Sequence, residues 1–274
     1  MPRVATRALK ILSASLVGTA VLGTAVPAFA APAAKPLTAN QIAKKANADF
    51  KAASSVEFYG KQSIMGQTVT ITETVAPQGC QIFENLGAGA TLQVLNVGAS
   101  QWVKLSDQAW QQLGYTGTDL GYVEGKWVTV AAFLQAFGLQ NVPTGPDDCH
   151  SHEASGLPST GWTLSKKLIK VSGQRAWQLS RKLNDAPLRA AVSDTKKPEI
   201  LAITLGGTTT YLSHYNARVT LAAPPADDVL TSLPPVPAPV PSPTASIGRA
   251  ARAGLARVVV AGLSHAGDLL AITR

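Results

Sequence analysis

The sequence lacks the local motifs that accompany many kinds of enzyme chemistry. It has no Gly-x-Ser-x-Gly turn, no phosphate-binding loop, no dinucleotide-binding glycine pattern and no paired zinc knuckles. No carboxylate pair stands out as an acid/base dyad. We therefore expect a protein that is not an enzyme and that needs no cofactor.

Positive charge is scarce in the middle of the chain, although the formal net charge is +8. Residues 31–245 hold 17 of the 24 Lys and Arg residues and 15 of the 16 Asp and Glu residues, which leaves a net charge of +2. The basic excess lies in the two ends, and no basic cluster with interleaved aromatic residues occurs between them. Nucleic acid is therefore not an expected partner.

The N-terminus has the pattern of a secretory signal peptide. Basic residues precede an apolar stretch at 11–26, and Ala28-Phe29-Ala30 supplies the small-x-small cleavage pattern. We expect cleavage after Ala30 and a secreted or extracytoplasmic protein of the cell envelope. A permanent membrane anchor is the alternative, but the apolar stretch is short for a membrane span. No cysteine lies near the cleavage site, so we expect no lipid attachment there.

Cysteine is equally scarce, with Cys80 and Cys149 as the two in the chain. In an exported protein an isolated pair most often forms a disulfide. It would close a loop of about 70 residues, which contributes about 4 kcal/mol in the chain-entropy model.

Apolar periodicity predicts an α+β fold. A capping box at Thr38 and Gln41 opens an amphipathic helix over residues 39–53, and a second, short helix follows at 130–137. Period-two alternation with turn residues between the runs indicates an antiparallel sheet. The expected strands are 56–62, 67–75, 80–84, 91–97, 100–105, 108–113, 165–171, 175–182, 199–205, 208–215 and 217–222.

Composition divides the chain into segments. After the signal peptide (1–30) we expect a disordered lead at 31–37 and a folded domain at 38–230. Residues 231–245 are proline-rich and indicate an extended linker. The Arg/Ala-rich tail at 246–274 is predicted to be disordered, with a weakly amphipathic surface helix as the alternative.

Three short motifs resemble functional sites, but the sequence around each one favours a structural role. Ser213 and His214 are adjacent in a predicted strand, where side chains alternate between faces, so we expect them to lie out of reach of one another. The histidines within 147–153 could bind a metal, but a solvated loop is the better interpretation. Residues 157–161 read Leu-Pro-Ser-Thr-Gly, a cell-wall sorting pentapeptide, yet a strand pattern follows where a sorting signal would end; we expect a surface turn.

Several predicted strands carry apolar residues on both faces, for example Leu92 and Leu95. One face can pack against the helices, and the other then needs protein or a ligand to cover it. A curved sheet with an apolar concave face is suited to hold lipid, whereas ordinary two-sided packing is the alternative.

Four stretches together resemble LppX/LprG-type actinobacterial lipoproteins. They are 41–58, 98–104 and 125–128, followed by the final segment 211–229. The resemblance covers about residues 38–230. It implies a LolA-like fold, in which a curved, incomplete antiparallel barrel with helices against it holds acyl chains. Unlike that family, this chain lacks the lipobox cysteine and carries the long C-terminal tail.

The resemblance implies a carrier of an acyl-chain lipid or lipoglycan, with an envelope protein as a further possible partner. An extracytoplasmic sensory or protein-interaction module with a filled cavity is the alternative. We expect the lipid to contact apolar side chains with the second helix at the cavity mouth. The candidates are Trp102, Trp110, Phe133, Phe137, Ile203 and Tyr211.

Overall fold

The computed structural model describes residues 36–64, 67–138, 156–183 and 185–235 of the chain. The chain divides into two units, Met1–Pro36 and Leu37–Arg274, and the fold below belongs to the second. The expected signal peptide, the polar segment 147–153 and the tail 246–274 lie outside the described residues. No described helix is long and apolar enough to cross a membrane.

The described helices are short and lie near the start of the domain, in its middle and near its end. They are α1 (Ala39–Lys51), α2 (Asp107–Leu113), α3 (Gly117–Val123) and α4 (Val130–Ala136), with a 3-10 turn η2 at Ala226–Asp228. The strands are β1 (Val56–Ile64), β2 (Gln67–Ala76), β3 (Gly79–Gly87), β4 (Ala90–Val97), β5 (Ser100–Leu105), β6 (Trp127–Thr129), β7 (Thr163–Leu164), β8 (Ile169–Val171), β9 (Gln174–Leu183), β10 (Ala186–Ser193), β11 (Ile200–Leu205), β12 (Thr208–Ser213) and β13 (Val229–Leu230).

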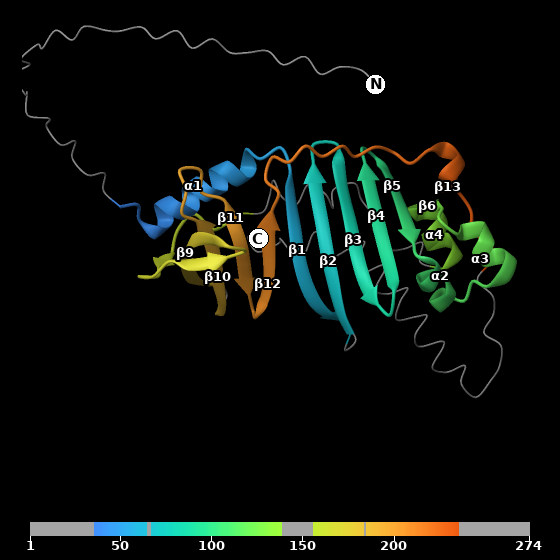
Figure 1. Cartoon of the computed structure of the whole chain (residues 1–274), viewed down its shortest axis with the longest axis horizontal. Helices are drawn as coiled ribbons and strands as arrows, with labels where there is room; N and C mark the ends of the chain where they lie inside the picture. The colour runs from blue at the N-terminus through green and yellow to red at the C-terminus, as the bar shows by residue number, and fades with distance from the viewer. Residues whose placement is uncertain (1–35, 65–66, 139–155, 184, 236–274) are drawn as a thin grey trace, which may run out of the picture. The chain divides into compact units, whose positions relative to one another are not determined.

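The strands form one large, curved, open sheet (Figure 1). Its order is β13-β6-β5-β4-β3-β2-β1-β12-β11-β10-β9-β7, with β8 also paired to β9. Two antiparallel meanders, β1–β5 and β9–β12, meet where β1 pairs with β12. Among the described pairs only β13 and β6 are parallel. The predicted α+β class with a curved, mostly antiparallel sheet and an N-terminal helix is confirmed.

The helices cover two ends of one face of the sheet, which we call the helix-side face. Helix α1 packs mainly against β7, β10 and β11, and α2 and α4 pack against β4, β5 and β6 (Figure 1). The strand registers align Phe58, Ile82 and Val94 on this face, and all three are buried. The opposite face, which we call the open face, carries Tyr59 and Phe83.

Helix α1 forms where the sequence predicts it. Thr38 accepts a hydrogen bond from the Gln41 amide through its side chain, and the Thr38 amide donates to Gln41 Oε1, so both halves of the capping box are present. The buried stripe Ile42, Ala46 and Phe50 follows at helical spacing. The second predicted helix, 130–137, corresponds to α4.

Four parts of the element prediction are wrong. The predicted strand 108–113 is helix α2, because the Ser106 side chain caps the Ala109 amide at 3.3 Å and starts a helix. Residues 217–222 run without strand pairing, since the left-handed backbone at His214 and Asn216 turns the chain out of the sheet. The predicted strand 165–171 is reduced to the three-residue β8. Helix α3 and the strands β6, β7, β10 and β13 were not predicted.

Candidate functional site

The structure does not bring the six predicted lipid-contacting residues together. Trp110, Phe133 and Phe137 lie in one cluster at the α2/α4 end. The ring centroid of Phe133 is 6.2 Å from that of Trp110 and 4.7 Å from that of Phe137. Ile203 is buried in a second cluster beneath α1. Trp102 packs on the open face and borders a shallow cavity of about 360 Å³. Tyr211 is also on the open face and is 41% exposed.

The buried side chains on the helix-side face of β1–β4 are apolar except for Glu73, Glu84 and Asn96. Glu73 and Glu84 are diagonal neighbours on β2 and β3, because Glu73 pairs with Ile82 while Ile71 pairs with Glu84. Both are almost fully buried. Each glutamate is two residues from an isoleucine of its own strand, Glu73 from Ile71 and Glu84 from Ile82. The alternation of the strands therefore indicates that they share the buried face, although we did not predict this.

Burial raises the pKa of Glu84 to about 7, because the charged form loses its hydration. Within the part of the chain that the structure describes, its Oε2 atom has no hydrogen-bond partner, and the same holds for Trp110 Nε1. A carboxyl that stays protonated can both donate and accept a hydrogen bond inside this apolar face.

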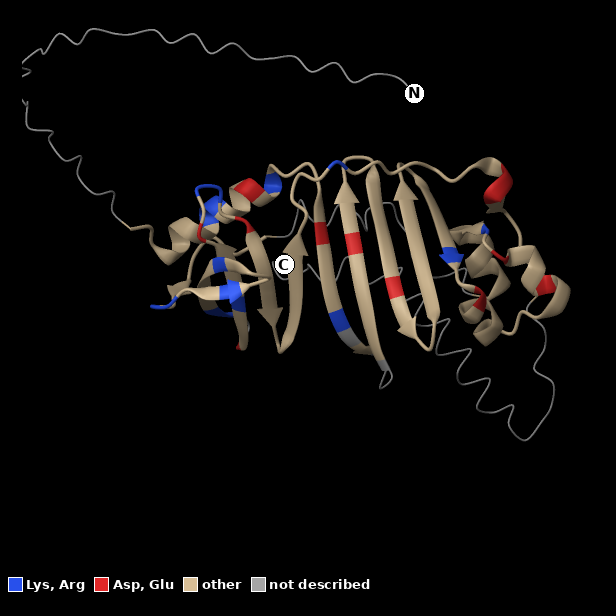
Figure 2. Cartoon of the chain, viewed as in Figure 1, with Lys and Arg blue, Asp and Glu red and all other residues tan. Residues whose placement is uncertain are grey.

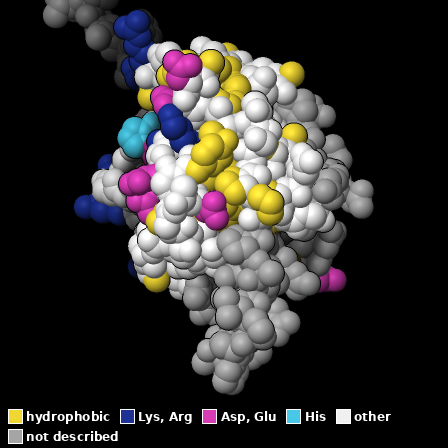
Figure 3. Space-filling model, turned by 90° about the vertical axis from the view of Figure 1, so that its right-hand side faces the viewer, with side chains coloured by type: hydrophobic (Ala, Val, Ile, Leu, Met, Phe, Trp, Pro, Cys, Tyr) yellow, Lys and Arg dark blue, Asp and Glu magenta, His cyan; other side chains and the backbone are white. Residues whose placement is uncertain are grey.

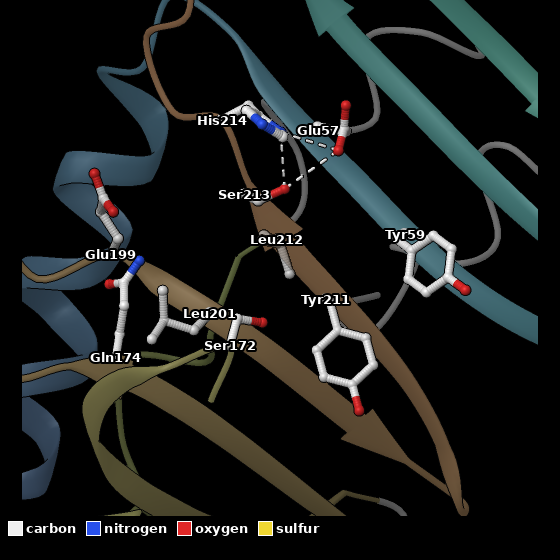
Figure 4. A pocket seen from close by; sticks show the side chains of 10 residues that line it. All are labelled: Glu57, Tyr59, Ser172, Gln174, Glu199, Leu201, Tyr211, Leu212, Ser213 and His214. Atoms are coloured by element: carbon white, nitrogen blue, oxygen red, sulfur yellow. Dashed lines mark hydrogen bonds and ion pairs between the residues drawn. The ribbon is translucent and has the colours of Figure 1, made fainter. Parts of the chain in front are cut away.

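Ser213 and His214 lie within hydrogen-bond reach, and the prediction that they do not is wrong. Ser213 ends β12, and His214 adopts a left-handed backbone conformation with φ of 52°. This breaks the alternation of the strand and brings His214 Nδ1 to 3.1 Å from Ser213 Oγ. Glu57 on β1 completes the group, with Oε1 3.0 Å from His214 Nδ1 and 3.3 Å from Ser213 Oγ (Figure 4).

The three side chains do not form the relay of a serine hydrolase. In that relay the two nitrogens of the imidazole contact the serine and the carboxylate separately. Here His214 Nδ1 faces both partners, and one carboxylate oxygen can accept from both Ser213 and His214. The geometry orients the three side chains and links β12 to β1.

A cavity of about 400 Å³ opens beside this group on the open face (Figure 4). A two-residue hairpin turn between β8 and β9 has positive φ at Ser172 and Gly173 and places Ser172 and Gln174 at its border. A β-bulge in the β10–β11 pairing turns Leu201 to the same side. The described lining residues are Glu57, Tyr59, Ser172, Gln174, Glu199, Leu201, Tyr211, Leu212, Ser213 and His214.

The other motifs have structural roles or lie outside the described residues. Leu157 is buried and its amide donates to Asn47 Oδ1 at 2.6 Å, so the pentapeptide 157–161 begins within the folded domain. No metal-binding group of three or more His, Cys, Asp or Glu occurs among the described residues. Cys80 is buried and disulfide-bonded, and its expected partner Cys149 lies outside the described residues.

Comparisons with known proteins leave the family open. No family model and no curated protein matches the chain. Structures of PNGF-II in the C2 and P21 space groups match with a TM-score of 0.25 and 8% sequence identity. The match covers 62% of this chain and 29% of that chain, and a similarity this weak carries no argument about fold family or function.

Proposed function

We propose that this chain is an exported, non-enzymatic protein that binds and carries an acyl-chain lipid or lipoglycan in the cell envelope. The observation that carries this proposal is the apolar helix-side face of the central strands. It continues from β12 through β5, while the described helices pack mainly near its two ends. The sequence resemblance to LppX/LprG-type proteins, with their LolA-like lipid cavity, points to the same function.

Physical chemistry favours an acyl chain on such a face. Each buried methylene contributes about 0.8 kcal/mol, so part of one chain gives useful affinity without a specific polar contact. The buried carboxyl of Glu84 and the indole N–H of Trp110 could hydrogen-bond to the polar group of an amphiphile.

Native mass spectrometry of the full chain purified from its own host, combined with organic extraction, tests this proposal. We expect a co-purifying acyl lipid at a defined stoichiometry. Ile82→Trp, which adds bulk on the helix-side face, should lower that stoichiometry. Phe83→Trp is the matched control, because Phe83 is the next residue on β3 and is 39% exposed on the open face.

Thermal melts would establish that both variants are folded. A wild-type protein that is always empty, and that takes up no fatty acid from mixed micelles, would contradict lipid carriage.

A sensory or protein-interaction module is the second candidate. It is favoured by the aromatic cluster of Trp110, Tyr115, Phe133 and Phe137, which fills one end of the helix-side face with protein. At this end the described hydrophobic side chains reach the surface in small groups (Figure 3). An empty protein that nevertheless captures an envelope protein through this end would favour the module.

A further inference from the structure

We propose that the cavity beside Tyr59 and Tyr211 on the open face is a binding site for a neutral saccharide. This site lies on the opposite side of the sheet from the proposed lipid face, so it does not depend on lipid carriage. Four separated parts of the chain build it: β1, the β8–β9 turn, the start of β11 and the end of β12. Its volume of about 400 Å³ falls within the range of small-molecule pockets.

The two tyrosines give the site an aromatic wall. Tyr59 and Tyr211 are directly paired across β1 and β12, and their ring centroids are 6.4 Å apart at an interplanar angle of 37°. Both rings stand at the same side of the cavity in Figure 4. Tyrosine presents an apolar ring and a hydroxyl at one time, which suits the C–H faces and the hydroxyl groups of a sugar.

The charge of the lining argues against an anionic ligand. The described lining residues include Glu57 and Glu199 but no Lys or Arg. Glu57 already accepts from Ser213 and His214. Burial, followed by the nearby charge of Asp49, raises the pKa of Glu199 above its ordinary value.

The balance of hydrogen-bonding groups favours a polyol over a cation. An ammonium group only donates, so it would leave the N–H and O–H donors of the lining without an acceptor. The lining also offers donors: the hydroxyls of Tyr59, Tyr211 and Ser172, and the amide of Gln174. A sugar hydroxyl both donates and accepts, and therefore matches this mixed set.

The open face extends the site along the sheet. The registers align Tyr211, Tyr59, Thr72, Phe83 and Gln93 in one row across five strands. No residue of this row is charged, and strands β1–β4 carry only isolated charges (Figure 2). Phe83 is exposed and lies two strands from Tyr59, about 10 Å away. A second ring of a linear glycan could stack there.

A glycan array followed by calorimetry tests the proposal. The full delipidated chain would be applied to neutral, acidic and amino-sugar glycans that carry no lipid, and the best ligand would be titrated. We expect neutral glycans to bind. Tyr59→Ala and Tyr211→Ala should each weaken binding by about tenfold, as expected for a tyrosine at the centre of an interface. Tyr211→Phe should lose less, because it keeps the ring.

Tyr122→Ala is the matched control, since Tyr122 is 47% exposed but belongs to α3. It should leave binding unchanged. The proposal is wrong if no neutral glycan binds, or if binding survives the Tyr59→Ala/Tyr211→Ala double substitution in a folded protein. Nα-acetyl-lysine methylamide serves as a probe with an ammonium group. The proposal is also wrong if this cation binds at the two tyrosines and glycans do not. Because no lipid is present, these outcomes leave the lipid proposal unaffected.

Discussion

Glu84 ties the stability of the protein to pH through a single side chain. Its carboxyl lies on the helix-side face of β3 next to Ile71 and Leu92, and burial raises its pKa from 4.5 to about 7. Between these two values the folded protein binds more protons at Glu84 than the unfolded chain does. This contribution to stability is therefore fully present below about pH 4.5 and is lost as the pH rises to about 7.

We predict that Glu84→Gln removes this loss. Relative to the wild type, the free energy of unfolding of the variant should rise by about 3 kcal/mol between about pH 4 and about pH 8. Urea denaturation at a series of pH values measures the difference. Glu124→Gln is the control, since Glu124 is exposed at the end of α3. A constant difference between Glu84→Gln and wild type across this range would contradict the burial of an ionisable carboxyl.

At the next scale, α1 holds the segment after residue 155 through a pair of hydrogen bonds. Asn47 accepts from the Leu157 amide at 2.6 Å through Oδ1 and donates to the Leu157 carbonyl through Nδ2. Asn47 is half-buried, and Leu157 is buried in the cluster under α1. The helix therefore positions backbone that lies 110 residues further along the chain.

We predict that Asn47→Ala lowers the free energy of unfolding by about 2 kcal/mol, because it leaves a buried amide and a carbonyl without partners. Lys45→Ala on the same helix should change it by less than about 0.5 kcal/mol, since Lys45 is exposed. Chemical denaturation of both variants gives the comparison. Equal stabilities of the two variants would mean that the Asn47 clamp contributes nothing.

The elements also mark where sequence patterns suffice and where they fail. The capping box and apolar stripe predicted α1, and threonine alternation predicted β2, because each signal is local. Strand β10 escaped prediction because small residues and Pro187 obscure its alternation. Gly117 and Gly121 similarly obscure α3. The 400 Å³ cavity could not be predicted, since it depends on a bulge at Leu201 and a left-handed turn at His214.

At the scale of the whole molecule, the pairing of β1 with β12 joins the two meanders. Glu57 and Ser213 are 156 residues apart in sequence and pair directly in the sheet. Nothing local in either strand identifies this partner, so the sequence predicted two half sheets without their junction. The same junction brings Glu57 to Ser213 and His214, and Tyr59 to Tyr211, which is why the candidate site was missed.

A disulfide at Cys80 links distant parts of the chain covalently. Cys80 lies fully buried on the helix-side face, beside Asn96 on β4, and it is disulfide-bonded. We predict that its partner is Cys149 of the same chain. Closing a loop of about 70 residues restricts the unfolded chain, so a Cys80→Ala/Cys149→Ala protein should be less stable by about 4 kcal/mol.

Peptide mapping of a non-reduced digest identifies the partner, and thermal melts with and without reductant measure the effect. In the wild type, the reductant should lower the melting temperature, whereas the double variant should melt at the same temperature in both conditions. A Cys80-to-Cys80 peptide from two chains would instead mean that the link is intermolecular. If both cysteines react with a thiol label in the absence of reductant, the protein has no disulfide and this prediction is wrong. Segment 147–153 would then again be a candidate metal site.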